Sequence, residues 1–137
     1  MRQQVVNPES LGAPRGYSNG VVLTGGAILF VAGQIGWDEH QRIVEGGFAT
    51  QFERALENTL TVVKAAGGAP ENIGRLTIYV TQKQEYVDAL HDIGAAYRRM
   101  MGSYYPAMAL VEVSALLEPG AKVEIEATAV LDAETTK

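Results

Sequence analysis

The last third of the chain contains two stretches in which apolar side chains recur at every second position. In residues 121–129 they alternate with charged or polar side chains, and in residues 107–116 the odd positions are all small and apolar. Because successive side chains of a β-strand point to opposite faces of a sheet, both stretches are predicted to be strands with one uniformly apolar face. The even positions of the earlier stretch form a mixed face: Met108, Leu110, Glu112, Ser114 and Leu116.

The middle of the chain is predicted to hold two helices with a strand between them. Residues 48–66 carry apolar side chains at the 3–4 residue spacing of an amphipathic helix, and Gly67-Gly68 follow where a helix commonly ends. Leu76–Val80 alternates as a strand. Residues 84 to about 101 are predicted to form the second helix, which Gly102 closes.

The first third is predicted to contribute a β-hairpin. Val21–Leu23 and Ala27–Gly33 have the composition of strands, and Thr24-Gly25-Gly26 would join them. The residues before this hairpin contain Pro and Gly at short intervals, which predicts an irregular lead-in. The second strand is apolar on both faces, as is usual for a strand buried on both sides.

The predicted order is therefore β-β-α-β-α-β-β. Two helices can cover only one face of such a sheet, so we expect a single α+β domain over residues 1–137, built as a two-layer sandwich of a mixed sheet with two helices on one face. The uniformly apolar strand faces are expected to meet the helices. The mixed faces would point away, and Met108 and Leu110 are too apolar for water, so we expect a second copy of the chain to cover them.

Composition argues against several classes of protein. The 137 residues include no Cys, which removes disulfides, thiolate catalysis and Cys-ligated metals. His40 and His91 have no second His three or four residues away, so no metal site is expected. A net charge of −5 without a Lys/Arg cluster argues against a nucleic-acid partner. Without a long apolar run or an apolar leader, we expect a cytoplasmic protein with no membrane partner.

Three carboxylates on the mixed strand faces are candidates for acid–base chemistry. Glu124 and Glu126 lie two residues apart on one face, and Glu112 lies on the mixed face of the preceding strand. Burial by a second copy would raise the pKa of such a carboxylate toward neutrality, as a general base or acid requires. The alternative is that these groups are solvated or paired with a cation such as Lys122.

Aromatic side chains and one arginine are candidates for ligand binding. Tyr17, Trp37, Tyr104 and Tyr105 lie in predicted loops beside the ends of strands, where they either line a pocket or close the edge of the core. Arg15, in the irregular lead-in, either meets an anionic ligand or faces solvent.

Seven segments occur in a fixed order along the chain: Gly16-Tyr17-Ser18-Asn19-Gly20, Phe30-Val31-Ala32-Gly33-Gln34-Ile35, Gln51 with Leu56-Glu57-Asn58, Ala65-Ala66-Gly67, Thr77-Ile78-Tyr79-Val80, Pro106-Ala107-Met108 and Val123-Glu124-Ile125-Glu126-Ala127-Thr128-Ala129. Together they run from about residue 14 to 130. As an ordered set they resemble the RidA family, also called YjgF or reactive intermediate deaminases.

The resemblance implies a chorismate-mutase-like α+β fold that assembles as a homotrimer, with three ligand sites in clefts between subunits. Members of the deaminase type hydrolyse enamines and imines, such as 2-aminoacrylate, to the keto acid and ammonia, without a metal or organic cofactor. The resemblance assigns to Glu124 the role of holding the attacking water and to Tyr17 that of positioning the ligand.

The chain departs from the deaminase pattern at several positions. Where the resemblance places an Arg that grips the substrate carboxylate, followed by a Ser or Thr, this chain has Met108 and Ala109. Leu110 stands where a Cys is common, and Ala32 replaces the Ser before Gly33. We therefore expect a more apolar site, with these substrate-binding candidates: Met108, Leu110, Trp37, Ala32, Gln34, Arg15 and Tyr105.

Two functions follow from these residues. The first is an enamine or imine deaminase whose substrate is larger or less anionic than 2-aminoacrylate, with Arg15 as a candidate replacement for the missing anchor. The alternative is a trimer that binds a small metabolite or a partner protein in the same clefts without catalysis.

Overall fold

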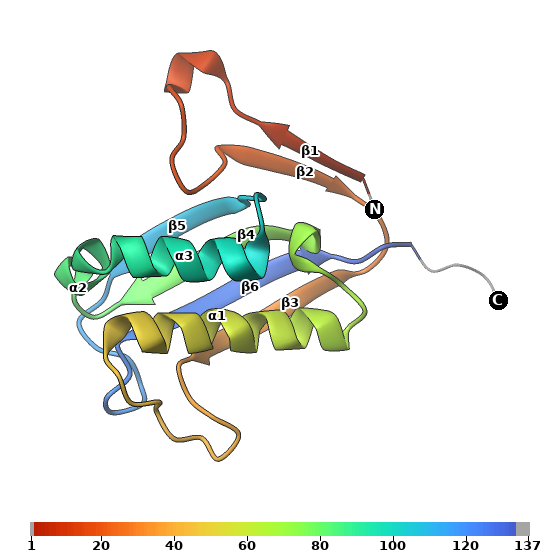
Figure 1. Ribbon diagram of the computed structural model, residues 1–137. Helices are drawn as coiled ribbons and strands as arrows, with labels where there is room; N and C mark the ends of the chain where they lie inside the picture. The colour runs from red at the N-terminus through yellow and green to blue at the C-terminus, as the bar shows by residue number, and fades with distance from the viewer. Residues whose placement is uncertain (1, 134–137) are drawn as a thin grey trace.

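The computed structural model describes residues 2–133 (Figure 1). Its elements, in chain order, are β1 (Arg2–Val6), η1 (Glu9–Leu11), β2 (Gly20–Thr24), β3 (Ile28–Ile35), α1 (Phe48–Ala65), η2 (Pro70–Asn72), β4 (Ile73–Val80), α2 (Lys83–Asp88), α3 (Leu90–Met101), β5 (Ala107–Glu112) and β6 (Val123–Val130). None of the helices within these residues has the length and apolar character needed to cross a bilayer.

The main sheet has four strands in the order β3-β6-β4-β5. β6 runs antiparallel to both of its neighbours, and β5 runs parallel to β4, so the sheet is mixed. Helices α1 and α3 lie side by side over one face of it (Figure 1). This arrangement confirms the predicted α+β sandwich.

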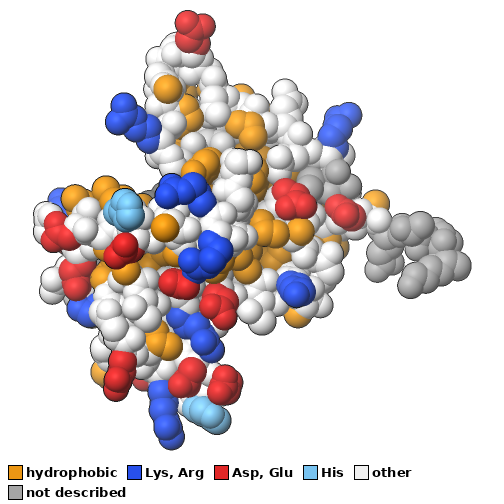
Figure 2. All heavy atoms as spheres, viewed as in Figure 1, with side chains coloured by type: hydrophobic (Ala, Val, Ile, Leu, Met, Phe, Trp, Pro, Cys, Tyr) orange, Lys and Arg blue, Asp and Glu red, His pale blue; other side chains and the backbone are white. Residues whose placement is uncertain are grey.

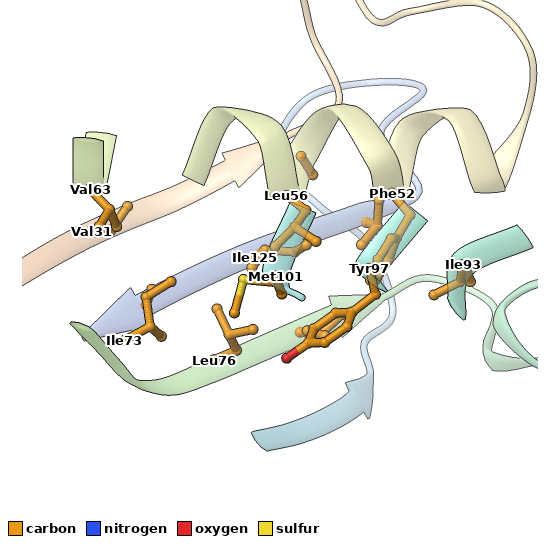
Figure 3. Close-up of a cluster of buried hydrophobic side chains, with 14 of the residues drawn as sticks. Val31, Phe52, Leu56, Val63, Ile73, Leu76, Ile93, Tyr97, Met101 and Ile125 are labelled. Atoms are coloured by element: carbon orange, nitrogen blue, oxygen red, sulfur yellow. The ribbon is translucent and has the colours of Figure 1, made fainter. Parts of the chain in front are cut away.

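The core lies between α1, α3 and the sheet (Figure 3). Phe52, Leu56 and Val63 occupy the buried side of α1, as their helical spacing predicts, and they pack with Ile125 of β6. Along β6 the odd-numbered residues are buried and the even-numbered residues are half-buried. The predicted apolar face of this strand therefore does meet the helices.

Three predicted features of the secondary structure are wrong. β2 pairs with β1 in a separate two-stranded sheet, with Val5 opposite Val21, and does not form a hairpin with β3. The lead-in therefore contains a strand as well as irregular chain. The second predicted helix is two helices, because Ala89 leaves helical geometry with φ −98° and ψ 8°.

A fourth prediction, the direction of the side chains on β5, is also wrong. Met108 pairs with Leu76 and Leu110 pairs with Ile78, and paired residues of adjacent strands lie on the same face. Leu76 and Ile78 belong to the core under the helices. Met108 and Leu110 therefore face the helices, opposite to the prediction. The small side chain of Ala109 and the branched side chain of Val111 face the other way.

Replacing Gly36 by Ala is expected to destabilise the fold by about 1–3 kcal/mol, because the new methyl group would overlap backbone atoms. A Cβ at Gly36 would lie 2.6 Å from the carbonyl oxygen of Gln51 and 2.7 Å from its Cα, and neither atom can move without shifting α1. Urea denaturation measures the effect. Gly20→Ala is the matched control, since its Cβ would meet only atoms of Val6 at 3.6 Å. Equal midpoints for the two variants would contradict this packing.

Candidate functional site

A cavity of about 440 Å³ lies among the segment that precedes β2, helices α2 and α3, and strands β4 and β5. Apolar and aromatic side chains form most of its wall, with two arginines among them. The lining residues are Arg15, Gly16, Tyr17, Phe52, Ile78, Tyr86, Leu90, Ile93, Gly94, Tyr97, Arg98, Tyr105, Met108 and Leu110. This volume falls in the range of about 300–1,000 Å³ that is typical of small-molecule sites.

The segment that carries Tyr17 is held against the start of β5 by Ser18. The buried Ser18 donates from its backbone N–H to the Pro106 carbonyl at 3.0 Å and from its Oγ to the Tyr105 carbonyl at 2.5 Å. These bonds place Tyr17, which is 40% exposed, at the cavity next to Met108. Tyr17 is thus positioned by backbone contacts although it lies in an irregular segment.

Stacked tyrosines stiffen one wall of the cavity. The rings of Tyr97 and Tyr105 are stacked with centroids 5.0 Å apart and an interplanar angle of 4°. The Tyr97 hydroxyl donates to the Tyr104 carbonyl at 2.7 Å, and the Tyr104 hydroxyl donates to the Ile73 carbonyl. The wall is therefore fixed by hydrogen bonds as well as by packing.

Tyr97 and Tyr104 stay protonated at neutral pH. Burial raises the pKa of Tyr104 to about 12, and burial, followed by the neighbouring tyrosines, also raises the pKa of Tyr97. An unfolded tyrosine ionises near pH 10. The folded chain therefore binds these protons more tightly than the unfolded chain does.

The free energy of unfolding is expected to fall as the pH rises through about 10 to 12. Below pH 10 both states are protonated, and above it the unfolded state releases protons that the folded tyrosines keep, so unfolding becomes more favourable. Urea denaturation at stepped pH, with tyrosinate absorbance recorded in parallel, measures this dependence. A flat stability profile across this range would contradict the assigned burial.

The opposite face of the main sheet carries carboxylates. Glu124 and Glu126 of β6 are half-buried there, and the Tyr79 hydroxyl donates to Glu126 Oε1 at 2.6 Å. This hydrogen bond raises the pKa of Tyr79. Glu124 lies against the backbone of Gly33, because a Cβ at Gly33 would come within 2.9 Å of Glu124 Cγ. A side chain at position 33 would displace the carboxylate from its present place against the backbone.

The structure brings together only part of the predicted site. Arg15, Tyr17, Tyr105, Met108 and Leu110 line the cavity as a group. Glu124 lies on the other face of the sheet from Met108 and Leu110, so within one chain these residues do not share a crevice. The prediction that the mixed face of β5 points away from the helices is therefore wrong. The physical reason is the parallel pairing of β4 and β5, which turns Met108 and Leu110 toward the helices.

The remaining candidates lie along or just after β3. Ala32 is exposed and flanks Gly33, and the half-buried Gln34 donates from Nε2 to the Ala32 carbonyl at 3.2 Å. Trp37 lies in the loop after the strand, where its carbonyl accepts from Asn58 Nδ2 at 2.9 Å. None of the three lines the cavity.

Two charged groups from the sequence analysis have structural contacts instead. Glu112 Oε1 accepts from the backbone N–H of Lys83 at 2.9 Å, which caps the start of α2. Lys122 Nζ pairs with Glu85 at 2.9 Å and not with the β6 carboxylates. His40 and His91 are exposed, and residues 2–133 contain no cluster of three or more potential metal-binding side chains.

Sequence reasoning missed the contribution of α3 to the cavity. Leu90, Gly94 and Arg98 recur every four residues, so they share one side of the helix, and all three line the cavity. A glycine in the middle of a predicted helix was the available signal, because such a residue is unfavourable there without a packing or functional reason.

Comparisons with known proteins agree with this fold. Residues 8–131 match the family model described as Endoribonuclease L-PSP. The human protein named 2-iminobutanoate/2-iminopropanoate deaminase is 29% identical over 99% of this chain and 95% of its own length. Protein DfrA of Myxococcus xanthus is 35% identical over 90% of this chain and 88% of its own length.

A solved structure has the same fold as this chain. YyfB from Yersinia pestis, described as a protein of unknown function of the conserved Rid protein family, superposes with a TM-score of 0.85 at 32% identity, covering 96% of this chain and all of YyfB. With sequence motifs, family model and fold in agreement, this chain belongs to the RidA/YjgF family of Rid proteins.

Proposed function

We propose that this protein is a deaminase that hydrolyses imines, and the enamines that tautomerise to them, to carbonyl compounds and ammonia. The carboxylate of Glu124, seated against Gly33 on the open face of the sheet, is the observation that carries the proposal. Relatives of this chain are named 2-iminobutanoate/2-iminopropanoate deaminase, and this name supports the same reaction class.

The working site is proposed to form between copies of the chain in a homotrimer. The cavity and Glu124 lie on opposite faces of one sheet, so a site that uses both needs the cavity of one copy and the carboxylate of another. The open face is apolar enough to be covered, since Phe30 is 76% exposed and Ile28 is 60% exposed there. Exposed apolar patches of this kind mark protein–protein contacts.

The reaction needs only water and a base. Glu124 accepts a proton from a water molecule while the oxygen of that water bonds to the imine carbon. The π electrons of the C=N bond move to nitrogen, which takes up a proton. The resulting carbinolamine then loses ammonia as its C–N bond breaks, and the oxygen forms the carbonyl while releasing its proton. Glu124 can return the first proton to the leaving nitrogen, so it ends the cycle as a carboxylate.

Tyr17 and the cavity supply orientation. Tyr17 carries a hydroxyl on a cavity wall made mostly of apolar and aromatic side chains, so it can hydrogen-bond a polar group of the ligand while the apolar part lies over Met108 and Leu110. Holding the imine carbon close to the Glu124 water turns an encounter in solution into a positioned reaction.

The test is hydrolysis of a panel of imines generated in situ by amino-acid oxidases. Purified protein should release ammonia faster than buffer alone, and it should sediment at about three times the chain mass of 14.7 kDa. A monomeric particle would reject the shared site. Ammonia release equal to buffer for every imine in the panel would reject the deaminase.

The second candidate function is ligand binding without catalysis. Met108 and Leu110 favour it, because they give the cavity apolar side chains where the family resemblance places polar ones. A ligand screen by thermal shift separates the two functions, since a binder is stabilised by its ligand without turnover. The description Endoribonuclease L-PSP gains no support from the chemistry of this chain, which has a net charge of −5 and no basic cluster.

A further inference from the structure

Two arginines line the cavity without a counter-charge. Arg15 lies in the segment before β2 and Arg98 lies on α3, and both are exposed. Within residues 2–133 neither guanidinium forms an ion pair with a carboxylate. The adjacent Arg99 differs, because it pairs with Glu53 of α1.

The lining of the cavity contains no acidic side chain, although the chain as a whole has a net charge of −5. Two positive charges beside an apolar wall repel each other and attract an anion from solution. On the face shown in Figure 2, Lys or Arg side chains lie beside apolar surface between the β1–β2 hairpin and α3. The local charge is thus opposite in sign to that of the molecule.

Gly94 makes room for one of these charges. Arg98 Nη1 would lie 3.2 Å from a Cβ at Gly94, one helical turn earlier, so the guanidinium rests over the bare backbone of the helix. A side chain at position 94 would fill part of the cavity and push Arg98 outward. Because glycine is unfavourable inside a helix, its presence here points to a requirement for this space.

The lining of the cavity indicates the kind of ligand that it fits. A 2-imino acid of three or four carbons would leave much of the apolar and aromatic wall uncovered. An aromatic or large aliphatic side chain would instead contact Phe52, Ile93 and Leu110, and stack near the Tyr97 ring. Guanidinium groups form paired, charge-assisted hydrogen bonds with carboxylates, which fits the other end of such a molecule.

We propose that Arg15 and Arg98 bind the carboxylate of the substrate, and that the substrates are 2-imino acids with an aromatic or large aliphatic side chain. That these acids are substrates rests on the proposed deaminase function, whereas binding of the matching 2-oxo acids by the two arginines does not. The substrate is therefore larger than 2-aminoacrylate, as the sequence indicates, and remains anionic.

Binding of phenylpyruvate, measured by calorimetry, tests the proposal. Arg15→Gln and Arg98→Gln are each expected to weaken binding about 10-fold, and the double variant about 100-fold, because each removes a charge-assisted contact. Phenylacetone, which lacks the carboxylate, should bind equally to all variants. Arg99→Gln is the matched control on the same helix and should bind phenylpyruvate as the wild type does.

Three results would overturn the proposal: no binding of phenylpyruvate, unchanged affinity in the double variant, or pyruvate binding as tightly as phenylpyruvate. Hydrolysis is assayed separately, with imines generated from phenylalanine, leucine and alanine. Arginine-dependent binding without ammonia release would reject the deaminase but keep the anion site. Ammonia release that is insensitive to both arginines would reject the anion site but keep the deaminase.

Discussion

Replacing Glu124 by Gln is expected to lower the rate of imine hydrolysis about 10²–10⁴-fold, the usual contribution of a positioned general base. The amide keeps the shape of the side chain and fits the same space against Gly33, but it cannot accept a proton from water. Binding of a 2-oxo acid should therefore change little. Steady-state ammonia release, measured beside calorimetric binding, separates the loss of chemistry from the loss of affinity.

Glu126→Gln is the matched control for this prediction. Glu126 lies two residues away on the same face of β6, but its carboxylate already accepts a hydrogen bond from Tyr79. We expect the hydrolysis rate of Glu126→Gln to stay within about 10-fold of the wild type. The loss of about 10²–10⁴-fold applies only to the carboxylate that holds the attacking water, and that role is assigned to Glu124. If Glu124→Gln hydrolyses imines as fast as the wild type, Glu124 is not the base.

Coexpression of two variants, each impaired in hydrolysis at low substrate concentration, tests whether Glu124 acts across subunits. Mixed assemblies of Glu124→Gln with the Arg15→Gln/Arg98→Gln double variant would contain some sites whose two halves are both intact. Such mixtures should recover activity that neither variant has alone. Failure to recover activity, in assemblies shown to be mixed, would show that Glu124 and the cavity do not form one site across subunits.

Replacing Phe30 by Asp is expected to split the assembly and to reduce hydrolysis at least as strongly as Glu124→Gln does. The side chain is 76% exposed in the single chain, so the fold should tolerate a carboxylate there. In an oligomer the same charge would be buried without a partner, which costs several kcal/mol at each interface. Sedimentation velocity, circular dichroism and the imine assay together measure the assembly, the fold and the activity.

Val87→Asp provides the comparison for this variant. Val87 is also an exposed apolar residue, 51% exposed on α2, but it belongs to the helical layer and not to the open sheet face. Its substitution should leave the sedimenting mass unchanged. A Phe30→Asp protein that still sediments as a trimer with full activity would show that the open face around β3 is not the interface.

A site shared between subunits explains why Glu124→Gln and Phe30→Asp are both expected to have large effects on catalysis. Met108 and Leu110 face the helices, and Glu124 faces away from them. The sheet thus separates the ligand-binding wall from the base, and assembly is proposed to bring one wall against another copy's base. Loss of assembly and loss of the base then have the same consequence for catalysis.

Local periodicity was sufficient to predict α1, β4 and β6. The buried face of α1 and that of β6 run along the whole element, and that of β4 alternates from Leu76 to Val80. The alternation or the helical spacing of apolar side chains therefore appears directly in the sequence. The residue types of the site were also recognisable, since Tyr17 and Glu124 belong to ordered motifs. These features depend on side chains that lie near one another in sequence.

The pairing of strands that lie far apart in the sequence was decided only by the tertiary structure. The pairing of β1 with β2 spans a loop without a hairpin signal, and the parallel contact of β5 with β4 reverses the faces that alternation alone assigns. Alternation states that Met108 and Ala109 point to opposite sides, but not which side is the core. That choice depends on which neighbouring strand supplies the hydrogen bonds, and it determined that Met108, Leu110 and Arg98 share a cavity while Glu124 does not.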